Sequence, residues 1–159
     1  MQRTLVLLKP DAIQRGLVGE VTARFERKGL KLTGMKMMAL SETMLEQHYS
    51  HISDKPFFPE LSSFMKSSPV IAQCWEGKDA VKTVRNLCGL TNAREAAPGT
   101  IRGDFAMSVQ CNVVHASEDA EAAKNELKRF FHEGDFFEYE KNEYIIAYSA
   151  DERGSTRQF

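Results

Sequence analysis

The sequence predicts an α+β protein built on a ferredoxin-like, split βαβ repeat: an antiparallel sheet with helices packed on one of its faces. Two observations lead to this prediction. Short runs of leucine and β-branched residues alternate along the chain with segments of helical periodicity. Their order is strand, helix, strand, two helices, strand, helix, long loop, strand and helix. No repeat or Gly/Ser linker interrupts the 159 residues, so we expect a single domain over residues 1–159.

The first part of the chain predicts two strands with a helix between them. Residues 4–8 form a continuous apolar run, which is typical of a buried strand. Apolar residues then recur at helical spacing over 18–25, and Gly29 provides a helix stop. Residues 30–37 alternate as a strand does, but Gly34 breaks the alternation, which predicts a β-bulge.

The middle of the chain predicts three helices and a strand. Helical patterns occupy residues 41–49 and 60–66, and a buried-strand pattern follows at 70–75. Residues 79–88 place their apolar side chains on one side of a helix that Gly89 ends.

The last part of the chain begins with a long loop. Residues 90–104 show neither helical nor strand periodicity, and loops of this length in compact domains are usually functional. A short strand follows at 113–115, and Ser117 is expected to cap a helix with an acidic first turn. Residues 144–148 are expected to form a last apolar strand before a polar tail.

Composition excludes several classes of protein. The chain is 42% hydrophobic and 27% charged, as globular proteins are, and its net charge of -1 gives no basic excess for nucleic acid or anionic lipid. The three cysteines form no C-x-x-C pair, so neither a zinc site nor a disulfide framework is indicated. No apolar run reaches the roughly 18 residues of a membrane span. We expect a cytoplasmic protein with no membrane partner.

His115 is the candidate nucleophile. It follows a short apolar strand and precedes a helix start, and a neutral imidazole can attack phosphorus without a base to deprotonate it. Glu126, on the following helix, is the candidate carboxylate for its second ring nitrogen. The alternative is a structural histidine. His48 and His51 are three residues apart and could share a helix face as metal ligands, but they have no evident third ligand.

Several other side chains suit a nucleotide. Lys9, Arg85 and Arg102 supply cations that phosphate oxygens prefer, and Thr91 adds a hydroxyl. Phe57 could stack on a base, although such residues are more often core. Neither G-x-x-x-x-G-K-[ST] nor G-x-G-x-x-G is present, so a nucleotide would bind without the usual glycine-rich loop.

Four ordered stretches resemble segments of the nucleoside diphosphate kinases: TLVLLKPDAIQRGLVGEV, KPFFPEL, APGTIRGDF and NVVHAS. The likeness extends to about Phe131. It implies a ferredoxin-like subunit that assembles as a homo-oligomer, a tetramer or a hexamer. It also implies ping-pong transfer of phosphate from ATP or another nucleoside triphosphate to a nucleoside diphosphate. Mg²⁺ is the implied cofactor, carried by the nucleotide phosphates and not by protein ligands.

The resemblance also implies a role for each matched residue. His115 is the nucleophile, Glu126 orients it, Ser117 joins its hydrogen bonds and Tyr49 packs beside it. Lys9 and Asn112 hold the sugar hydroxyl, and Lys9 also meets the transferring phosphate. The residues implied at the phosphates and base are Arg85, Thr91 and Arg102, with Phe57 stacking on the base and Val109 across from it.

The chain departs from the family pattern in three places. Ala116 stands where glycine is common, with little expected effect. Ala93 stands where proline is common, which predicts a less stable loop or looser assembly. From about residue 136 the sequence diverges, so a C-terminal extension of the single domain is expected to affect the oligomer rather than catalysis.

Two other functions stay open at this point. The chain could be a nucleotide-binding regulator without significant turnover. It could also be an RNA-recognition module, although the aromatic strand motif of that module is missing and nucleic acid is not expected as the primary partner.

Overall fold

The computed structural model describes residues 1–153, and these form a four-stranded antiparallel sheet with the order β2-β3-β1-β4. Strands β1 (Gln2–Leu8) and β3 (Val70–Gly77) occupy its centre, while β2 (Lys31–Met38) and β4 (Val114–Ala116) form its edges. This order, with every pairing antiparallel, is that of the ferredoxin-like fold, as predicted.

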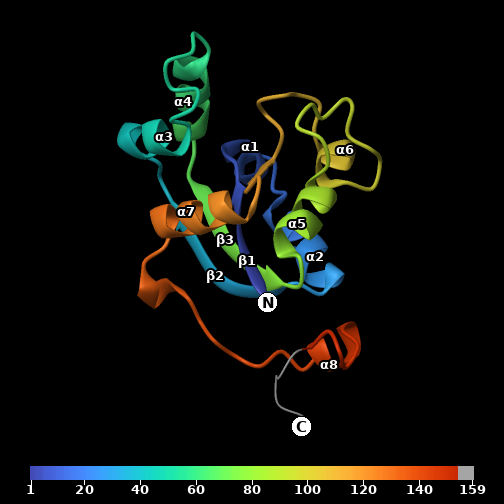
Figure 1. Cartoon of the computed structure of the whole chain (residues 1–159). Helices are drawn as coiled ribbons and strands as arrows, with labels where there is room; N and C mark the ends of the chain where they lie inside the picture. Colours follow the sequence, from blue (N-terminus) through green and yellow to red (C-terminus); the bar gives the residue numbers. More distant parts are fainter. Residues whose placement is uncertain (154–159) are drawn as a thin grey trace.

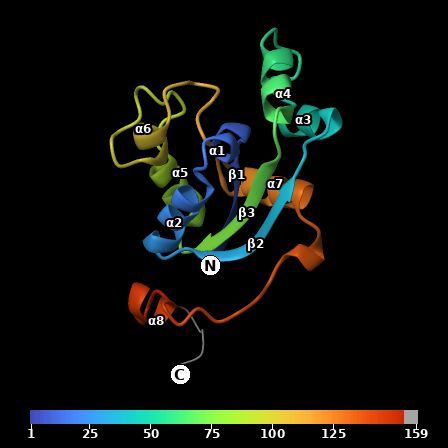
Figure 2. The same cartoon turned by 180° about the vertical axis from the view of Figure 1, so that it is seen from behind.

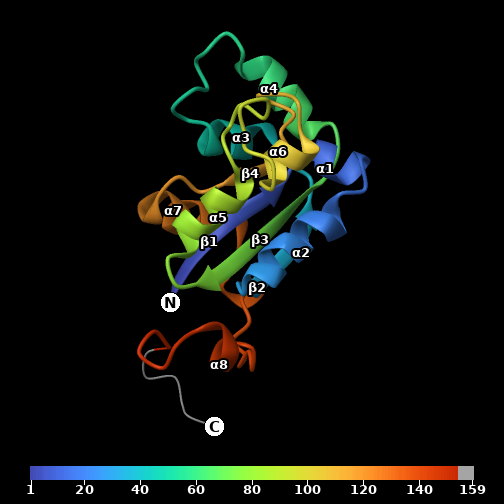
Figure 3. The same ribbon diagram turned by 90° about the vertical axis from the view of Figure 1, so that its right-hand side faces the viewer.

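Helices cover both faces of the sheet, so the expectation of helices on one face is wrong (Figures 2 and 3). Val6 and Leu8 of β1 belong to one buried cluster, whereas Leu5 and Leu7 belong to a second. The continuous apolar run of β1 indicates burial on both faces, because a strand with one face in solvent alternates apolar and polar residues. An RNA-recognition module reads RNA on an open sheet face, and this sheet has none.

The helices divide between the two clusters. The first cluster contains residues of α1 (Pro10–Gln14), α2 (Val18–Lys28), α5 (Ala80–Cys88) and α6 (Ile101–Phe105). The second contains residues of α3 (Glu42–His48), α4 (Phe58–Lys66) and α7 (Ala120–Phe130). None of the helices within residues 1–153 is long and apolar enough to cross a membrane.

Local signals set most of the element ends. Gly29 ends α2 in the left-handed conformation, with φ of 100°, and the Ser41 side chain accepts a hydrogen bond from Met44 N at the start of α3. The predicted bulge in β2 is confirmed by a register shift between Leu32 and Gly34.

Two expectations near the site need correction. The cap of α7 is Asp119, whose carboxylate accepts from Ala122 N, and not Ser117. The segment 90–104 is not wholly irregular, because Thr100 caps the one-turn helix α6. Both short polar side chains and short helices leave ambiguous patterns in a sequence.

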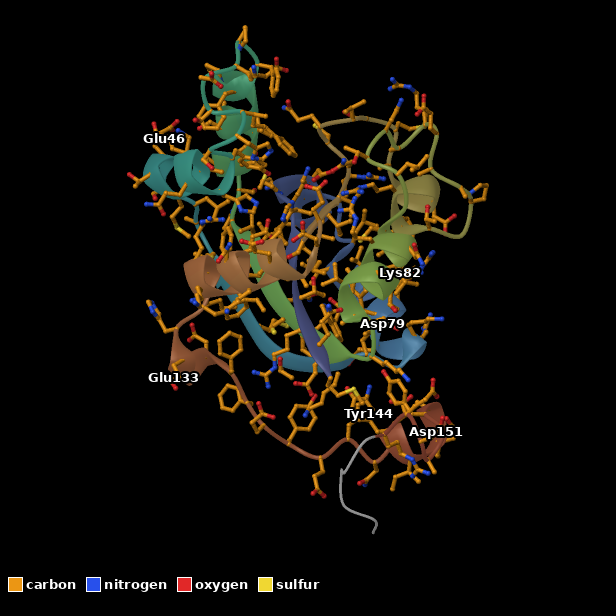
Figure 4. All side chains as sticks on the ribbon, viewed as in Figure 1. Glu46, Asp79, Lys82, Glu133, Tyr144 and Asp151 are labelled. Atoms are coloured by element: carbon orange, nitrogen blue, oxygen red, sulfur yellow. The ribbon has the colours of Figure 1, made fainter. Side chains whose placement is uncertain are left out.

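The C-terminal segment runs below the sheet, at the end opposite the α3–α4 arm (Figure 1). It passes through the single-turn helix η1 (Glu133–Asp135), and Phe137 N then donates to Thr33 O of the bulge at 2.8 Å. The strand expected at 144–148 is wrong, since Tyr144–Ala147 forms the one-turn helix α8. Tyr144, labelled in Figure 4, donates its hydroxyl to Glu76 O at 3.0 Å and so attaches this helix to the end of β3.

Candidate active site

A cleft of about 830 Å³ lies at the end of the sheet where the α3–α4 arm faces the loop that carries α6 (Figure 1). Every predicted site residue except Ser117 lines it: Lys9, Tyr49, Phe57, Arg85, Thr91, Arg102, Val109, Asn112, His115 and Glu126. These residues come from positions spread over most of the chain, so the fold brings together what the sequence could only list.

His115 stands on β4, and its side chain is fixed by the strand register. His115 pairs with Leu7 of β1, and cross-strand partners project to the same face of a sheet. That face is the one covered by α7, which carries Glu126. The imidazole Nε2 lies 3.1 Å from Glu126 Oε1.

Ser117 lies behind this pair and is fully buried. Its hydroxyl donates to Glu126 Oε2 at 2.6 Å and accepts from Leu5 N at 3.3 Å. Both carboxylate oxygens of Glu126 are therefore engaged. Ser117 belongs to this hydrogen-bond chain and does not line the cleft itself.

These contacts decide which nitrogen of His115 can react. Burial acts to raise the pKa of Glu126, but hydrogen bonds from His115 and Ser117 outweigh it and lower that pKa to about 2. An ionised carboxylate only accepts hydrogen bonds, so Nε2 carries the imidazole proton. In this tautomer the lone pair is on Nδ1, which is the nitrogen available as a nucleophile.

His48 is the neighbour that the sequence reasoning missed as part of this site. Its ring meets the His115 ring edge-on at 4.5 Å between centroids and also meets the Tyr49 ring at 4.6 Å. Tyr49 thus lies in the same aromatic group as His115, with His48 in contact with both. His48 directly precedes Tyr49 in the sequence, and nothing in the pattern distinguishes it from a core histidine.

The His48 ring is neutral. Burial, with the nearby His115, lowers its pKa to about 2. Arg129 donates to His48 Nδ1 at 3.2 Å. Among residues 1–153, His48, His115 and Glu126 form the group whose ligand atoms lie within 4.8 Å of one another, and His51 is not part of it. The suggested His48–His51 metal pair is therefore not what the fold assembles.

Lys9 and Asn112 form the floor of the cleft. Lys9 is 7% exposed, and its Nζ donates to Asn112 Oδ1 at 2.7 Å and to Gln110 O at 3.2 Å. Asn112 Nδ2 donates in turn to Thr91 O and Val109 O. Burial, and then the charge of Arg102, lower the pKa of Lys9 to about 8. The ammonium is held in place where an anion could offset its desolvation.

Arg102 and Arg85 supply further positive charge. Arg102 is 8% exposed and donates to Gly89 O and Val114 O, while its Nε has no partner within the described chain. Burial lowers the pKa of this guanidinium, with Arg85 as a further cause. Arg85 is exposed and reaches Ala116 O at 3.5 Å. Positive charges that face a cleft without carboxylate partners suit phosphate groups.

Two exposed apolar side chains stand at the mouth of the cleft. Phe57 precedes α4 and is 51% exposed, and Val109 lies in the loop after α6 and is 50% exposed. An apolar slot between an aromatic ring and an aliphatic side chain accepts the flat face of a base. Thr91, also exposed, completes the polar side of the loop.

This arrangement defines a class of protein. A histidine with its tautomer fixed by a carboxylate lines a cleft together with a buried lysine, two arginines and two exposed apolar side chains. That is what a phosphotransferase acting on nucleotides through a histidine requires.

Comparison with known proteins identifies the family within this class. The family model described as nucleoside diphosphate kinase matches residues 2–136. The chain is 54% identical over 152 residues to the nucleoside diphosphate kinase of Parabacteroides distasonis, covering 96% of this chain and 99% of that protein. It is 52% identical over 141 residues to the enzyme of Archaeoglobus fulgidus, covering 89% and 93% of the two chains.

A solved structure agrees with these relatives. The halophilic nucleoside diphosphate kinase from Halobacterium salinarum, solved in complex with CDP, superposes with a TM-score of 0.91 at 43% identity. The superposition covers 93% of this chain and 99% of that chain. The chain belongs to the nucleoside diphosphate kinase family. It is a phosphotransferase that moves the terminal phosphate between nucleotides through a phosphohistidine, and as a kinase of this family it needs a divalent metal.

Proposed function

We propose that His115 is the phosphorylated residue and that its Nδ1 is the attacking atom. The observation that carries this proposal is the chain from His115 Nε2 through Glu126 to Ser117, which leaves Nδ1 unprotonated. The Nδ1–phosphorus bond forms as the bond from the γ-phosphorus to its bridging oxygen breaks, and the nucleoside diphosphate leaves. The imidazole becomes cationic, and Glu126 stabilises that charge. A second nucleoside diphosphate reverses the step.

The cations of the cleft would hold the phosphates. Arg85 and Arg102, with the Thr91 hydroxyl, are assigned to the α- and β-phosphates, and Lys9 to the transferring group and the sugar hydroxyl. Asn112 shares the sugar contact, because its amide is already fixed by Lys9, Thr91 and Val109. The negative charge of the phosphates is thus balanced by Lys9 and by the two arginines.

Base recognition would rest on Phe57 and Val109. Stacking accepts any π-face, and a slot formed by these two side chains has no polar edge to read one base. This predicts that purine and pyrimidine nucleotides are all substrates. The complex of the halobacterial relative with CDP supports a nucleotide in this cleft.

The divalent metal would be Mg²⁺ bound to the nucleotide phosphates. The donors in the cleft fit this role: Glu126 is occupied by His115 and Ser117, which leaves Glu118 as the one other carboxylate of the lining, beside lysine and arginine. Mg²⁺ usually keeps several waters and bridges phosphate oxygens. When bound, it would neutralise part of the phosphate charge.

The subunit is proposed to form a homo-oligomer, a tetramer or a hexamer, in the cytoplasm. An edge strand with Met35 at 46% and Met37 at 59% exposure supports the first statement, since such edges pair with other chains. Free thiols at Cys74, Cys88 and Cys111 support a reducing compartment. Residues from about 136 are proposed to be an extension of the single domain that is not part of catalysis.

Steady-state kinetics test the central proposal. Initial rates of GTP formation from ATP and GDP, measured at several fixed GDP concentrations, should give the parallel double-reciprocal lines of a ping-pong reaction. His115→Ala should abolish turnover while binding ADP with unchanged affinity. Unchanged turnover in that variant contradicts the mechanism. A folded wild-type protein that binds ADP but turns over no substrate would instead indicate the nucleotide-binding regulator.

A further inference from the structure

The backbone just before His115 is strained. Val113 has φ of 74°, and Asp79 is the other non-glycine residue within 1–153 with a positive φ. Val114 N donates to Asn112 O at 2.9 Å, so residues 112–114 form a γ-turn with valine at its centre. This turn, with central φ near +75°, is the rare one of the two γ-turns. It is especially unfavourable for a β-branched residue.

Three hydrogen bonds hold this turn, and a carboxylate accepts one of them. Asp11 Oδ2 accepts from Val113 N at 3.0 Å, Lys9 N donates to Val113 O at 2.9 Å, and Arg102 donates to Val114 O at 2.7 Å. Val113 is fully buried, so its N–H has no access to water and needs this acceptor. The other oxygen, Asp11 Oδ1, is buried without a partner within the described chain.

The turn stands between the two parts of the active site. On one side is Asn112, whose amide is bonded to Lys9 and to the loop carbonyls of Thr91 and Val109. On the other side, two residues along the chain, is His115. The conformation of Val113 therefore sets the direction in which β4 leaves the floor of the cleft. It also sets the position of the His115 imidazole.

We propose that Asp11 is a positioning residue for phosphoryl transfer: by accepting from Val113 N–H it keeps the strained turn that places His115 against the nucleotide. Asp11 is not a catalytic residue, because the cleft lining does not include it. The inference rests on the proposed function of His115. The competing explanation is that Asp11 merely adds stability as the acidic residue in the first turn of α1.

The test separates the rate of His115 phosphorylation from nucleotide affinity and from stability. Asp11→Ala removes the acceptor, Asp11→Asn keeps an amide oxygen of the same reach, and Glu26→Ala changes an exposed acidic residue on α2 as the control. For each protein we would measure single-turnover phosphorylation by ATP in rapid quench, the Kd for ADP by calorimetry, and the melting temperature.

Asp11→Ala should slow phosphorylation at saturating ATP by at least tenfold while the Kd for ADP changes less than threefold. Asp11→Asn should recover most of the rate, and Glu26→Ala should match the wild type. A positioning error acts on the chemical step, whereas partial unfolding lowers rate and binding capacity together.

A double-mutant cycle gives an independent readout. Glycine takes φ of 74° without the penalty that valine carries, so the turn in Val113→Gly depends less on its acceptor. Adding Asp11→Ala to Val113→Gly should slow phosphorylation less than threefold further, although both changes lower the melting temperature. That outcome would show that the effect of Asp11→Ala on the rate acts through the turn and does not result from lost stability.

Three results would overturn the inference. They are an Asp11→Ala rate within twofold of the wild type, an Asp11→Asn rate as low as that of Asp11→Ala, and an equal effect of Asp11→Ala with valine or glycine at 113. If the wild-type protein itself takes no phosphate from ATP, the proposed function fails first and the role of Asp11 falls with it.

Discussion

Replacing Glu126 by glutamine keeps the shape of the side chain but removes its charge and one of its two acceptors. The carboxylate accepts from His115 Nε2 at 3.1 Å and from the Ser117 hydroxyl at 2.6 Å. A glutamine amide has one oxygen, so at least one of these donors would face an NH₂ group instead. The imidazole would also lack the negative charge that stabilises it when Nδ1 takes the phosphoryl group.

The structure bounds the size of this effect. At an effective dielectric constant of about 20, unit charges at the observed 3.1 Å separation attract by about 5 kcal/mol, which is the upper limit. Hydrogen bonds to charged groups contribute a net ~1.5–3 kcal/mol. Since each 1.4 kcal/mol is a factor of ten in rate, Glu126→Gln should slow phosphorylation of His115 by about 10- to 150-fold.

The assay is single-turnover phosphorylation by saturating ATP, followed by acid-free quench, with the Kd for ADP measured separately. Glu121→Gln, an exposed change on the same helix, is the matched control and should behave as the wild type. Nucleotide affinity should change little in Glu126→Gln, because Glu126 hydrogen-bonds His115 and Ser117. A rate within twofold of the wild type, or an equal loss in Glu121→Gln, would refute the assignment of the carboxylate.

Four further outcomes are expected. Since the pKa of Lys9 is lowered to about 8, kcat/KM, which reports the free enzyme, should fall as pH rises through 8 and the ammonium loses its proton; a flat profile to pH 9.5 contradicts this. Phe25→Ala should lower the free energy of unfolding in urea by about 3–5 kcal/mol, because this ring is fully buried; a loss below about 1 kcal/mol contradicts the packing. Gly103→Ala should weaken ADP binding, measured by calorimetry, about tenfold, because the new Cβ would lie 2.0 Å from Ala97 O and would displace α6, which carries Arg102. Unchanged affinity would argue against Arg102 as a ligand. Removing residues 137–159 should leave kcat/KM within twofold but lower the melting temperature, since the described part of this segment packs at the opposite end from the cleft; a large loss of kcat/KM would place the extension in catalysis.

The pH prediction concerns activity, and the corresponding effect on stability has the opposite sign. The pKa of Lys9 is lower in the folded protein than the ordinary 10.5, so burial of its charged form costs stability at neutral pH. That cost is relieved as pH rises from about 8 toward 10.5. Activity and stability should therefore diverge in this window, which distinguishes loss of the Lys9 proton from general alkaline unfolding.

Much of the fold follows from local sequence signals at bulges and at the ends of helices. The bulge is marked by Gly34, the start of α3 by Ser41 and the end of α2 by Gly29. The error at 144–148 has a physical reason: a run of five apolar residues satisfies both strand and helix patterns, and the tertiary contacts of the segment decide between them. Only the cap expected at Ser117 is wrong, because a serine hydroxyl suits a helix cap as well as it suits Glu126.

The site could be listed from the sequence but not assembled. The resemblance supplied His115, Glu126 and the cations, and the fold brings them to one cleft. Two features had no signal at all. His48 contributes through contact with two other rings, and Val113 adopts a backbone conformation that valine itself disfavours. Tertiary contacts impose both, so periodicity and propensity cannot reveal them.

Phosphate passes through His115 in the proposed mechanism, and isotope transfer can follow it there. The protein would be mixed with Mg²⁺ and γ-labelled ATP, quenched in base, and digested to find the labelled peptide. A second, identical sample would receive unlabelled GDP before its quench. We expect base-stable, acid-labile label on His115 that moves to GTP when GDP is added. Label on another residue, or label that GDP does not remove, would contradict it.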